Sequence, residues 1–204
     1  MATHSPVMDQ VEEPAWDIAK LFPNQGEWGE DDYLALDTNH LVEFTNGYIE
    51  VLPMPTIPHQ RLVFFFQRML WAFVVEHHLG EVLAAPLRIR LRPRKYREPD
   101  VVFIAKGHED RYQEQFWRGA DLVVEVVSPD DRNRDLSKKR SEYAQAGIPE
   151  YWLGDPEQQT ITVLWLEGET YVAHSAFPSG ETATSRLLPG FTVAVSTIFA
   201  AAQA

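Results

Sequence analysis

Residues 120–127 read ADLVVEVV, and this stretch decides the fold class of the protein. Apart from Asp121 and Glu125, its residues are apolar and mostly β-branched. Such a composition is typical of a strand with both faces covered, as in the centre of a sheet that helices flank. The stretch therefore predicts a central strand that carries a buried carboxylate.

The residues that follow predict a return to the same sheet. Ser128-Pro129-Asp130 ends the strand, and residues 135–146 predict a helix that Gly147 closes. Residues 150–153, EYWL, predict another strand. A strand, a helix and a strand in this order fit a right-handed crossover between parallel strands.

The residues before the central strand predict one helix and two more strands. Residues 59–79 carry apolar side chains at helical spacing, and residues 81–92 and 99–105 predict strands. The order is then helix, three strands, helix and strand, which predicts a mixed α/β domain.

Two additions to this core are predicted. Residues 41–45 and 48–52 flank Asn46-Gly47, a pair typical of a hairpin because both central residues of a type I′ turn need positive φ. Residues 160–166 and 170–174 predict a strand meander near the C-terminus.

The first residues differ in character from the rest. Residues 1–28 mix proline, acids and isolated aromatics without a period, and predict an extended or disordered acidic arm. We therefore expect a single folded domain over residues 29–204.

Composition excludes several classes of protein. The 204 residues are 45% hydrophobic and 24% charged, which is typical of a folded globular protein. No apolar stretch approaches the roughly 18 residues of a membrane-spanning helix, which excludes a transmembrane protein. The absence of cysteine excludes disulfide scaffolds, thiolate zinc sites and cysteine nucleophiles. Because the N-terminus lacks the pattern of an export signal, we expect a cytoplasmic protein.

The charge distribution bears on nucleic-acid binding. The net charge of -12 argues against a polyanionic partner, but the acids are dense in the first 32 residues. Basic residues gather in segments 88–97 and 132–140. We expect five of them to contact DNA phosphates, namely Arg88, Arg90 and Arg92, which would share one face of a strand, and Arg132 and Arg134. The alternative is two solvated basic surfaces.

Asp100 and Glu125 are the candidate metal ligands. Asp100 leads one predicted strand and Glu125 lies inside another, where a carboxylate is costly unless it is paired or bound to a cation. Together they could hold Mg²⁺ or Mn²⁺ through oxygen ligands. On the next helix, Asp135, Lys139 and Tyr143 share one face because they are four residues apart. The alternative is that Asp100 caps a turn, Glu125 pairs with an arginine and Lys139 lies on the surface.

Several motifs along the chain resemble the bacterial Uma-two family of restriction endonucleases. These are VEFTNG at residues 42–47, Met54-Pro55, His59, EPDVVF at residues 98–103, DLVVEVVSP at residues 121–129, the series Asp135, Lys139 and Tyr143, and GIPEYW at residues 147–152. The resemblance covers residues 30–199. It implies the restriction-endonuclease-like core of the PD-(D/E)XK nuclease superfamily, whose element order is the one predicted above.

The resemblance also implies roles for individual residues. Asp100 would be the acid of the PD pair and Glu125 that of the (D/E)XK element, both binding the metal, with Glu43 as an additional ligand. The motif lysine would stand at position 127, where this chain has Val127. Lys139 resembles a migrated replacement. His59, Asp135 and Tyr143 are expected as accessory residues, and the resemblance implies a homodimer.

These observations predict a Mg²⁺- or Mn²⁺-dependent endonuclease that hydrolyses DNA, with Asp100, Glu125 and Lys139 as catalytic residues. The alternative is a catalytically degenerate protein of the same fold that binds nucleic acid or acts as a dimeric interaction protein, and Val127 favours it. A serine hydrolase is unsupported because Ser128 lacks evident partners. The sequence contains no glycine-rich phosphate-binding loop, which argues against a nucleotide-driven enzyme.

Overall fold

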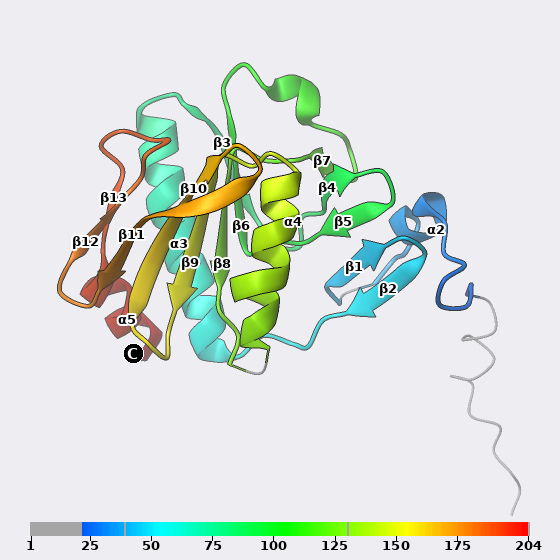
Figure 1. Ribbon diagram of the computed structural model, residues 1–204, viewed down its shortest axis with the longest axis horizontal. Helices are drawn as coiled ribbons and strands as arrows, with labels where there is room; N and C mark the ends of the chain where they lie inside the picture. The colour runs from blue at the N-terminus through cyan, green and yellow to red at the C-terminus, as the bar shows by residue number, and fades with distance from the viewer. Residues whose placement is uncertain (1–21, 39, 130, 204) are drawn as a thin grey trace, which may run out of the picture.

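A six-stranded sheet forms the centre of the protein (Figure 1). The computed structural model describes residues 22–38, 40–129 and 131–203. The strand order is β11-β10-β9-β8-β6-β3. The bounds of its first four strands in chain order are β3 Gly80–Ala84, β6 Val101–Ala105, β8 Leu122–Val126 and β9 Glu150–Asp155.

The element order predicted for the core is confirmed. Helix α3 (Ile57–Glu76) precedes β3, β6 and β8. Strand β6 pairs antiparallel with β3 on one side and with β8 on the other. The chain then passes through the π-helix η2 (Arg134–Lys139) and helix α4 (Arg140–Gln145) into β9, which lies parallel to β8. The crossover predicted from residues 120–153 is therefore present.

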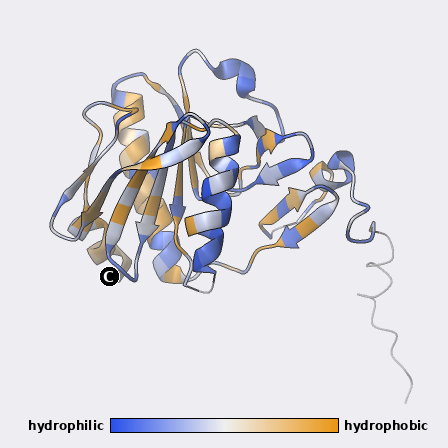
Figure 2. Cartoon of the chain, viewed as in Figure 1, coloured by the Kyte–Doolittle hydropathy of each residue, from blue (hydrophilic) through white to orange (hydrophobic). Residues whose placement is uncertain are grey.

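Helices cover both faces of this sheet (Figure 1). Leu122, Val124 and Val126 of β8 pack into one apolar cluster with α3, whereas Val123 packs into another that includes Tyr143 of α4. Figure 2 shows hydrophobic residues along the central strands and hydrophilic ones over much of η2 and α4. The alternation along β8 places the Glu125 side chain on the α4 side of the sheet.

A second sheet has the order β2-β1-β5-β4-β7. Strands β1 (Val42–Thr45) and β2 (Tyr48–Val51) form the predicted hairpin, with φ of 50° at Asn46 and 95° at Gly47. The other strands are β5 (Lys95–Arg97), β4 (Ile89–Arg92) and β7 (Trp117–Arg118). Helix α2 (Glu30–Leu34) packs on the hairpin through Tyr33, in a separate apolar cluster with Val42, Phe44 and Tyr96.

The single strand predicted over residues 81–92 is wrong. The structure has two strands there, β3 in the large sheet and β4 in the small one. Pro86 lies between them, and proline has no N–H with which to continue a strand ladder. Arg88, Arg90 and Arg92 consequently belong to the small sheet and the segment that leads into it.

The C-terminal region extends the large sheet as predicted. Strands β10 (Thr160–Glu167) and β11 (Thr170–Pro178) form the meander beside β9. A small hairpin of β12 (Thr182–Thr184) and β13 (Thr192–Ala194) and helix α5 (Val195–Gln203) follow. The short element η1 (Glu109–Arg111) lies between β6 and β7.

Glu150 ties this C-terminal region to the sheet. Its fully buried carboxylate accepts hydrogen bonds from Trp152 Nε1 (2.7 Å), Ser185 Oγ (2.6 Å) and the backbone N–H groups of Arg186 and Leu187 (both 2.8 Å). We expect Glu150→Ala to lower the free energy of unfolding by about 3 kcal/mol, because several buried donors lose their acceptor. Urea unfolding would measure this loss.

Glu167→Ala provides the control for that prediction. The Glu167 side chain is exposed and makes only a 3.6 Å ion pair with Arg186, so its removal should change stability by about 0.5 kcal/mol or less. Equal effects of the two substitutions would contradict the role given to Glu150.

Residues 1–21 of the predicted arm lie outside the described residues. The last part of that arm packs on the hairpin: the N–H groups of Gly26 and Trp28 donate to the Gly47 carbonyl, and the Gln25 side chain bonds the backbone of Ile49. The boundary at residue 28 stays a prediction. Among the described residues, no helix is long and apolar enough to cross a membrane.

Candidate active site

The structure brings Asp100, Glu125 and Lys139 together. Asp100 directly precedes β6 and Glu125 lies in β8, the neighbouring strand. The register pairs Val101 with Val124, so Asp100 lies opposite Glu125, on the same face of the sheet. Lys139, at the end of η2, places its Nζ 2.8 Å from Glu125 Oε2.

The predicted accessory residues complete this cluster. Lys139 Nζ lies 3.2 Å from Asp135 Oδ1, and the Tyr143 hydroxyl donates to Glu125 Oε1 at 2.5 Å. His59 Nε2 lies 3.2 Å from Asp100 Oδ1, while the Val126 N–H donates to Asp100 Oδ2 at 2.7 Å. Each carboxylate oxygen of Asp100 and Glu125 therefore has one partner.

The π-helix η2 positions Asp135 and Lys139. Both side chains are buried, and they face the sheet beside Tyr143 from the first turn of α4. The Asp135 carboxylate also accepts from the Ser128 N–H, at 3.3 Å, while its backbone carbonyl accepts from the Tyr151 hydroxyl, at 3.1 Å. π-helical turns are rare and are frequently found at functional sites. Here the turn fixes an ammonium between two carboxylates.

Burial makes it costly for the groups of this cluster to carry charge. Loss of solvent raises the pKa of Asp100 above its ordinary value and that of Glu125 to about 8, although Lys139 opposes the rise at Glu125. Burial alone would lower the pKa of Lys139, but the carboxylates around it, Glu125 foremost, raise it. Three carboxyl groups thus surround one ammonium, and a divalent cation that replaced the protons of Asp100 and Glu125 would balance their negative charge.

The raised pKa of Glu125 predicts a pH dependence of stability without metal. In the unfolded chain the Glu125 carboxyl ionises at about pH 4.3. Between that pH and about pH 8, the folded protein therefore holds one more proton than the unfolded chain. Stability therefore falls as pH rises through this window. We expect the wild type to lose about 2 kcal/mol more than Glu125→Gln between about pH 5.5 and pH 8.5. Urea unfolding in EDTA would measure it, and equal losses in both proteins would contradict it.

A cavity of about 240 Å³ opens above these groups. Asp100, Glu125, Asp135 and Lys139 line it on one side. The segment after the hairpin lines it on another with apolar side chains, namely Leu52, Pro53, Met54 and Pro55. The candidate catalytic groups therefore lie in a partly enclosed cavity.

The donor set fits a hard divalent cation that keeps water ligands. Asp100 and Glu125 offer carboxylate oxygens that each retain a second lone pair. Mg²⁺ in proteins is usually bound by one or two carboxylates together with water and substrate oxygens. In the described part of the chain, no group of three or more His, Asp or Glu side chains is arranged to hold a metal ion.

Glu43 lies near this cluster, since its charge helps to raise the pKa of Lys139, but it makes no direct contact with Asp100, Glu125 or Lys139. Its role as a third metal ligand stays a prediction. Glu43 is buried in β1 and does not line the cavity. Its carboxylate pairs with Arg97 Nε at 3.3 Å and with Arg134. Its charge is thus already neutralised by two guanidinium groups.

Most of the predicted phosphate-contacting arginines make internal ion pairs. Arg88 lies 3.5 Å from Glu98, Arg90 lies 3.3 Å from Glu30, and Arg132 lies 2.5 Å from Asp155. Arg92 is exposed. Arg134 pairs with Glu43 and Glu50 and is the one member of the five that lines the cavity.

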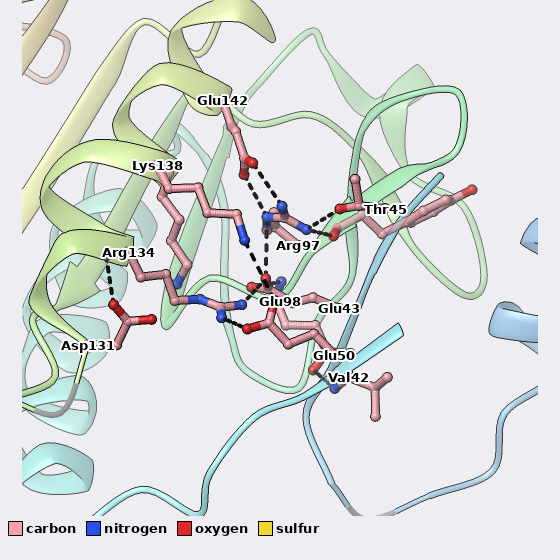
Figure 3. A network of polar contacts seen from close by, with 12 residues as sticks. Val42, Glu43, Thr45, Glu50, Arg97, Glu98, Asp131, Arg134, Lys138 and Glu142 are labelled. Carbon is pink, nitrogen blue, oxygen red and sulfur yellow. Dashed lines mark hydrogen bonds and ion pairs between the residues drawn. The ribbon is translucent and has the colours of Figure 1, made fainter. Parts of the chain in front are cut away.

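An ion-pair network that the sequence did not predict joins the small sheet to η2–α4 (Figure 3). Arg97 bonds Glu142 through two N–H groups, at 2.7 and 2.9 Å, and Lys95 Nζ lies 2.6 Å from Glu142. A signal was present: positions 134, 138 and 142 repeat the four-residue spacing of the Asp135 series. They form a second, charged face of the same helical segment.

Comparisons with known proteins agree with this architecture. The family model Uma2, described as "Putative restriction endonuclease", matches residues 30–196. A solved structure, described as "a putative nuclease" from Anabaena variabilis, is 19% identical, covers 84% of this chain and 97% of its own, and superposes with a TM-score of 0.69. No curated protein sequence matches significantly. The structural match shows the restriction-endonuclease-like fold that the sequence predicts.

Proposed function

Because the chain belongs to the Uma2 family, we propose that it is a metal-dependent endonuclease that hydrolyses phosphodiester bonds of DNA. The family and the solved structure support a nuclease. The observation that carries the finer proposal is the meeting of Asp100, Glu125 and Lys139 in one cavity.

In this proposal, Asp100 and Glu125 hold a Mg²⁺ or Mn²⁺ ion. The bound ion would supply a water of lowered pKa and stabilise negative charge on the phosphate. The excess of buried carboxylates over ammonium groups supports this assignment, since unbalanced buried charge is costly. The backbone N–H of Val126 and the His59 ring hold Asp100 in place from two directions.

The surrounding residues of the chain orient the reacting groups. Lys139 fixes one oxygen of Glu125 and Tyr143 fixes the other, so this carboxylate cannot rotate freely. The Lys139 ammonium also places positive charge beside the cavity, where negative charge develops on the phosphate. Asp135 holds Lys139 from the opposite side. His59 lines the cavity and can hydrogen-bond a water molecule there.

One observation favours a second candidate, a protein that binds nucleic acid without cutting it. Val127 occupies the position of the motif lysine, and its side chain is buried in the apolar cluster beside α4. No ammonium can arise from that position. The nuclease proposal therefore depends on Lys139 serving in its place.

Metal titration tests the site independently of substrate. We expect saturating Mn²⁺ or Mg²⁺ to raise the melting temperature of the wild type by about 5 °C or more, because a ligand at about 100 times its Kd stabilises by about 2.7 kcal/mol. Asp100→Ala should lose this increase. Incubation of the wild type with plasmid and with single-stranded DNA, with and without Mn²⁺, then tests cleavage. A metal-induced shift without cleavage of either DNA would favour the binding protein.

A further inference from the structure

Arg134 and Lys139 are the only lysine or arginine residues that line the cavity in the part of the chain that the structure describes. Lys139 is held by Glu125 and Asp135, and its side chain is only 5% exposed. Arg134 lies at the other end of η2, with 12% of its side chain exposed. It is therefore the cation that an incoming anion can reach with the least rearrangement.

The two carboxylates that bind Arg134 differ in their surroundings (Figure 3). Its Nη2 bonds Glu43, which is fully buried and also bound by Arg97. Its Nη1 bonds Glu50 of β2, an edge strand, and the Glu50 side chain is 48% exposed. Exposed ion pairs contribute little free energy, whereas separating a buried pair is costly. The Glu50 contact is thus the exchangeable one.

Glu50 has a second cation within reach. Lys138 Nζ, also on η2, lies 3.7 Å from Glu50 Oε2, and its side chain is 51% exposed. If Arg134 Nη1 released Glu50, the carboxylate would keep a partner and remain in contact with water. Arg134 would stay anchored to Glu43 through Nη2. The exchange would therefore leave no buried charge unpaired.

The rest of the cavity is acidic. Its lining includes six carboxylate residues, Glu50, Glu98, Asp100, Glu125, Asp131 and Asp135. Such a lining repels a phosphodiester unless a cation in the cavity binds it. A guanidinium is well suited to this task because its planar N–H groups match phosphate oxygens in geometry and charge.

From these contacts we propose that Arg134 binds a phosphate of the substrate strand, and that Glu50 occupies the same guanidinium in the free protein as an internal competitor. The proposal rests on the nuclease function and deepens it. Glu50 thereby lowers the affinity of the cavity for anions until a substrate phosphate displaces it.

Strand binding without cleavage tests this competition. The probe is a fluorescein-labelled oligothymidylate strand, and its anisotropy is measured in EDTA at low ionic strength, where screening is weak. We expect Glu50→Gln to tighten binding about fivefold, which corresponds to about 1 kcal/mol. Arg134→Gln should weaken it by at least this factor, and Arg134→Lys should weaken it less.

The double variant Glu50→Gln, Arg134→Gln separates competition from simple charge repulsion. If Glu50 acts through Arg134, its replacement has no effect once Arg134 is gone. Equal tightening in both backgrounds, no effect of Glu50→Gln, or unchanged binding in Arg134→Gln would each overturn the proposal. Glu157→Gln is the matched control, since this exposed acid pairs with Arg132 outside the cavity.

Two further measurements keep the outcome unambiguous. Thermal unfolding checks that each variant is folded, and Glu50→Gln is the safest of them because Glu50 is half exposed on an edge strand. Cleavage of DNA with Mn²⁺ is measured separately. Absence of cleavage would contradict the nuclease function, whereas the binding pattern alone decides the roles of Arg134 and Glu50.

Discussion

Asp100→Asn is expected to lower the rate of DNA cleavage by at least about 10³-fold while the protein stays folded. The substitution keeps the size of the side chain but removes the negative charge that would hold the cation. Because burial already raises the pKa of Asp100, the neutral amide should be tolerated in the metal-free fold. Initial rates of plasmid cleavage in Mg²⁺ and Mn²⁺ would measure the loss.

Asp31→Asn is the control for this prediction, because it removes one exposed acid of α2 that does not line the cavity. Its cleavage rate should match that of the wild type. If Asp100→Asn retained more than about a tenth of the activity, Asp100 would not be an essential metal ligand. A melting temperature close to that of the wild type would show that lost activity does not reflect unfolding.

Lys139→Met is expected to abolish cleavage and also to destabilise the metal-free protein by about 3 kcal/mol. The substitution keeps an unbranched side chain but leaves Glu125 and Asp135 buried without their shared cation. Saturating Mn²⁺ should recover part of that stability, because a cation at Asp100 and Glu125 would offset the same negative charge. Urea unfolding with EDTA or Mn²⁺ measures both effects.

Lys138→Met is the matched control, since Lys138 is the neighbouring lysine on η2 and its side chain is half exposed. Its stability should change by about 0.5 kcal/mol or less. Should Lys139→Met cleave DNA as fast as the wild type, the view that Lys139 replaces the lysine missing at position 127 would be wrong. A stable but inactive Lys139→Met protein would instead separate its catalytic role from its structural one.

The elements that carry Asp100, Glu125 and Lys139 were predictable because their local patterns are strong, whereas the resemblance to the Uma-two family implied that the three side chains meet. The β-branched run around Glu125 fixes a central strand, and the four-residue spacing around Lys139 fixes one face of a helix. Neighbouring strands and a crossover helix then leave few arrangements. The alternative in which Lys139 lies on the surface is wrong, because it is buried against Glu125.

The partners of Glu43 and Arg134 were not predictable in the same way. Their pairing joins a hairpin to a helix 91 positions further along the chain, and no local pattern specifies such a contact. Likewise, alternation over residues 81–92 predicted one strand, because apolar periodicity does not reveal to which sheet each half belongs. Pro86 was the local signal that the strand ends. Within the π-helix η2, Asp135 contacts the loop after β8 and Tyr151, and no local pattern of residues 134–139 reveals either contact.

The ion-pair network between the small sheet and η2–α4 has a consequence for how such a protein can diverge. The hairpin and α2 have their own apolar cluster, apart from those of the large sheet. Substitutions inside one cluster therefore need no repacking in the other. A change at Glu43, Arg97 or Glu142, in contrast, must be matched by a change on the opposite element. Compensatory pairs of substitutions should therefore accumulate along this boundary. Residues within one apolar cluster, in contrast, should change independently of the other.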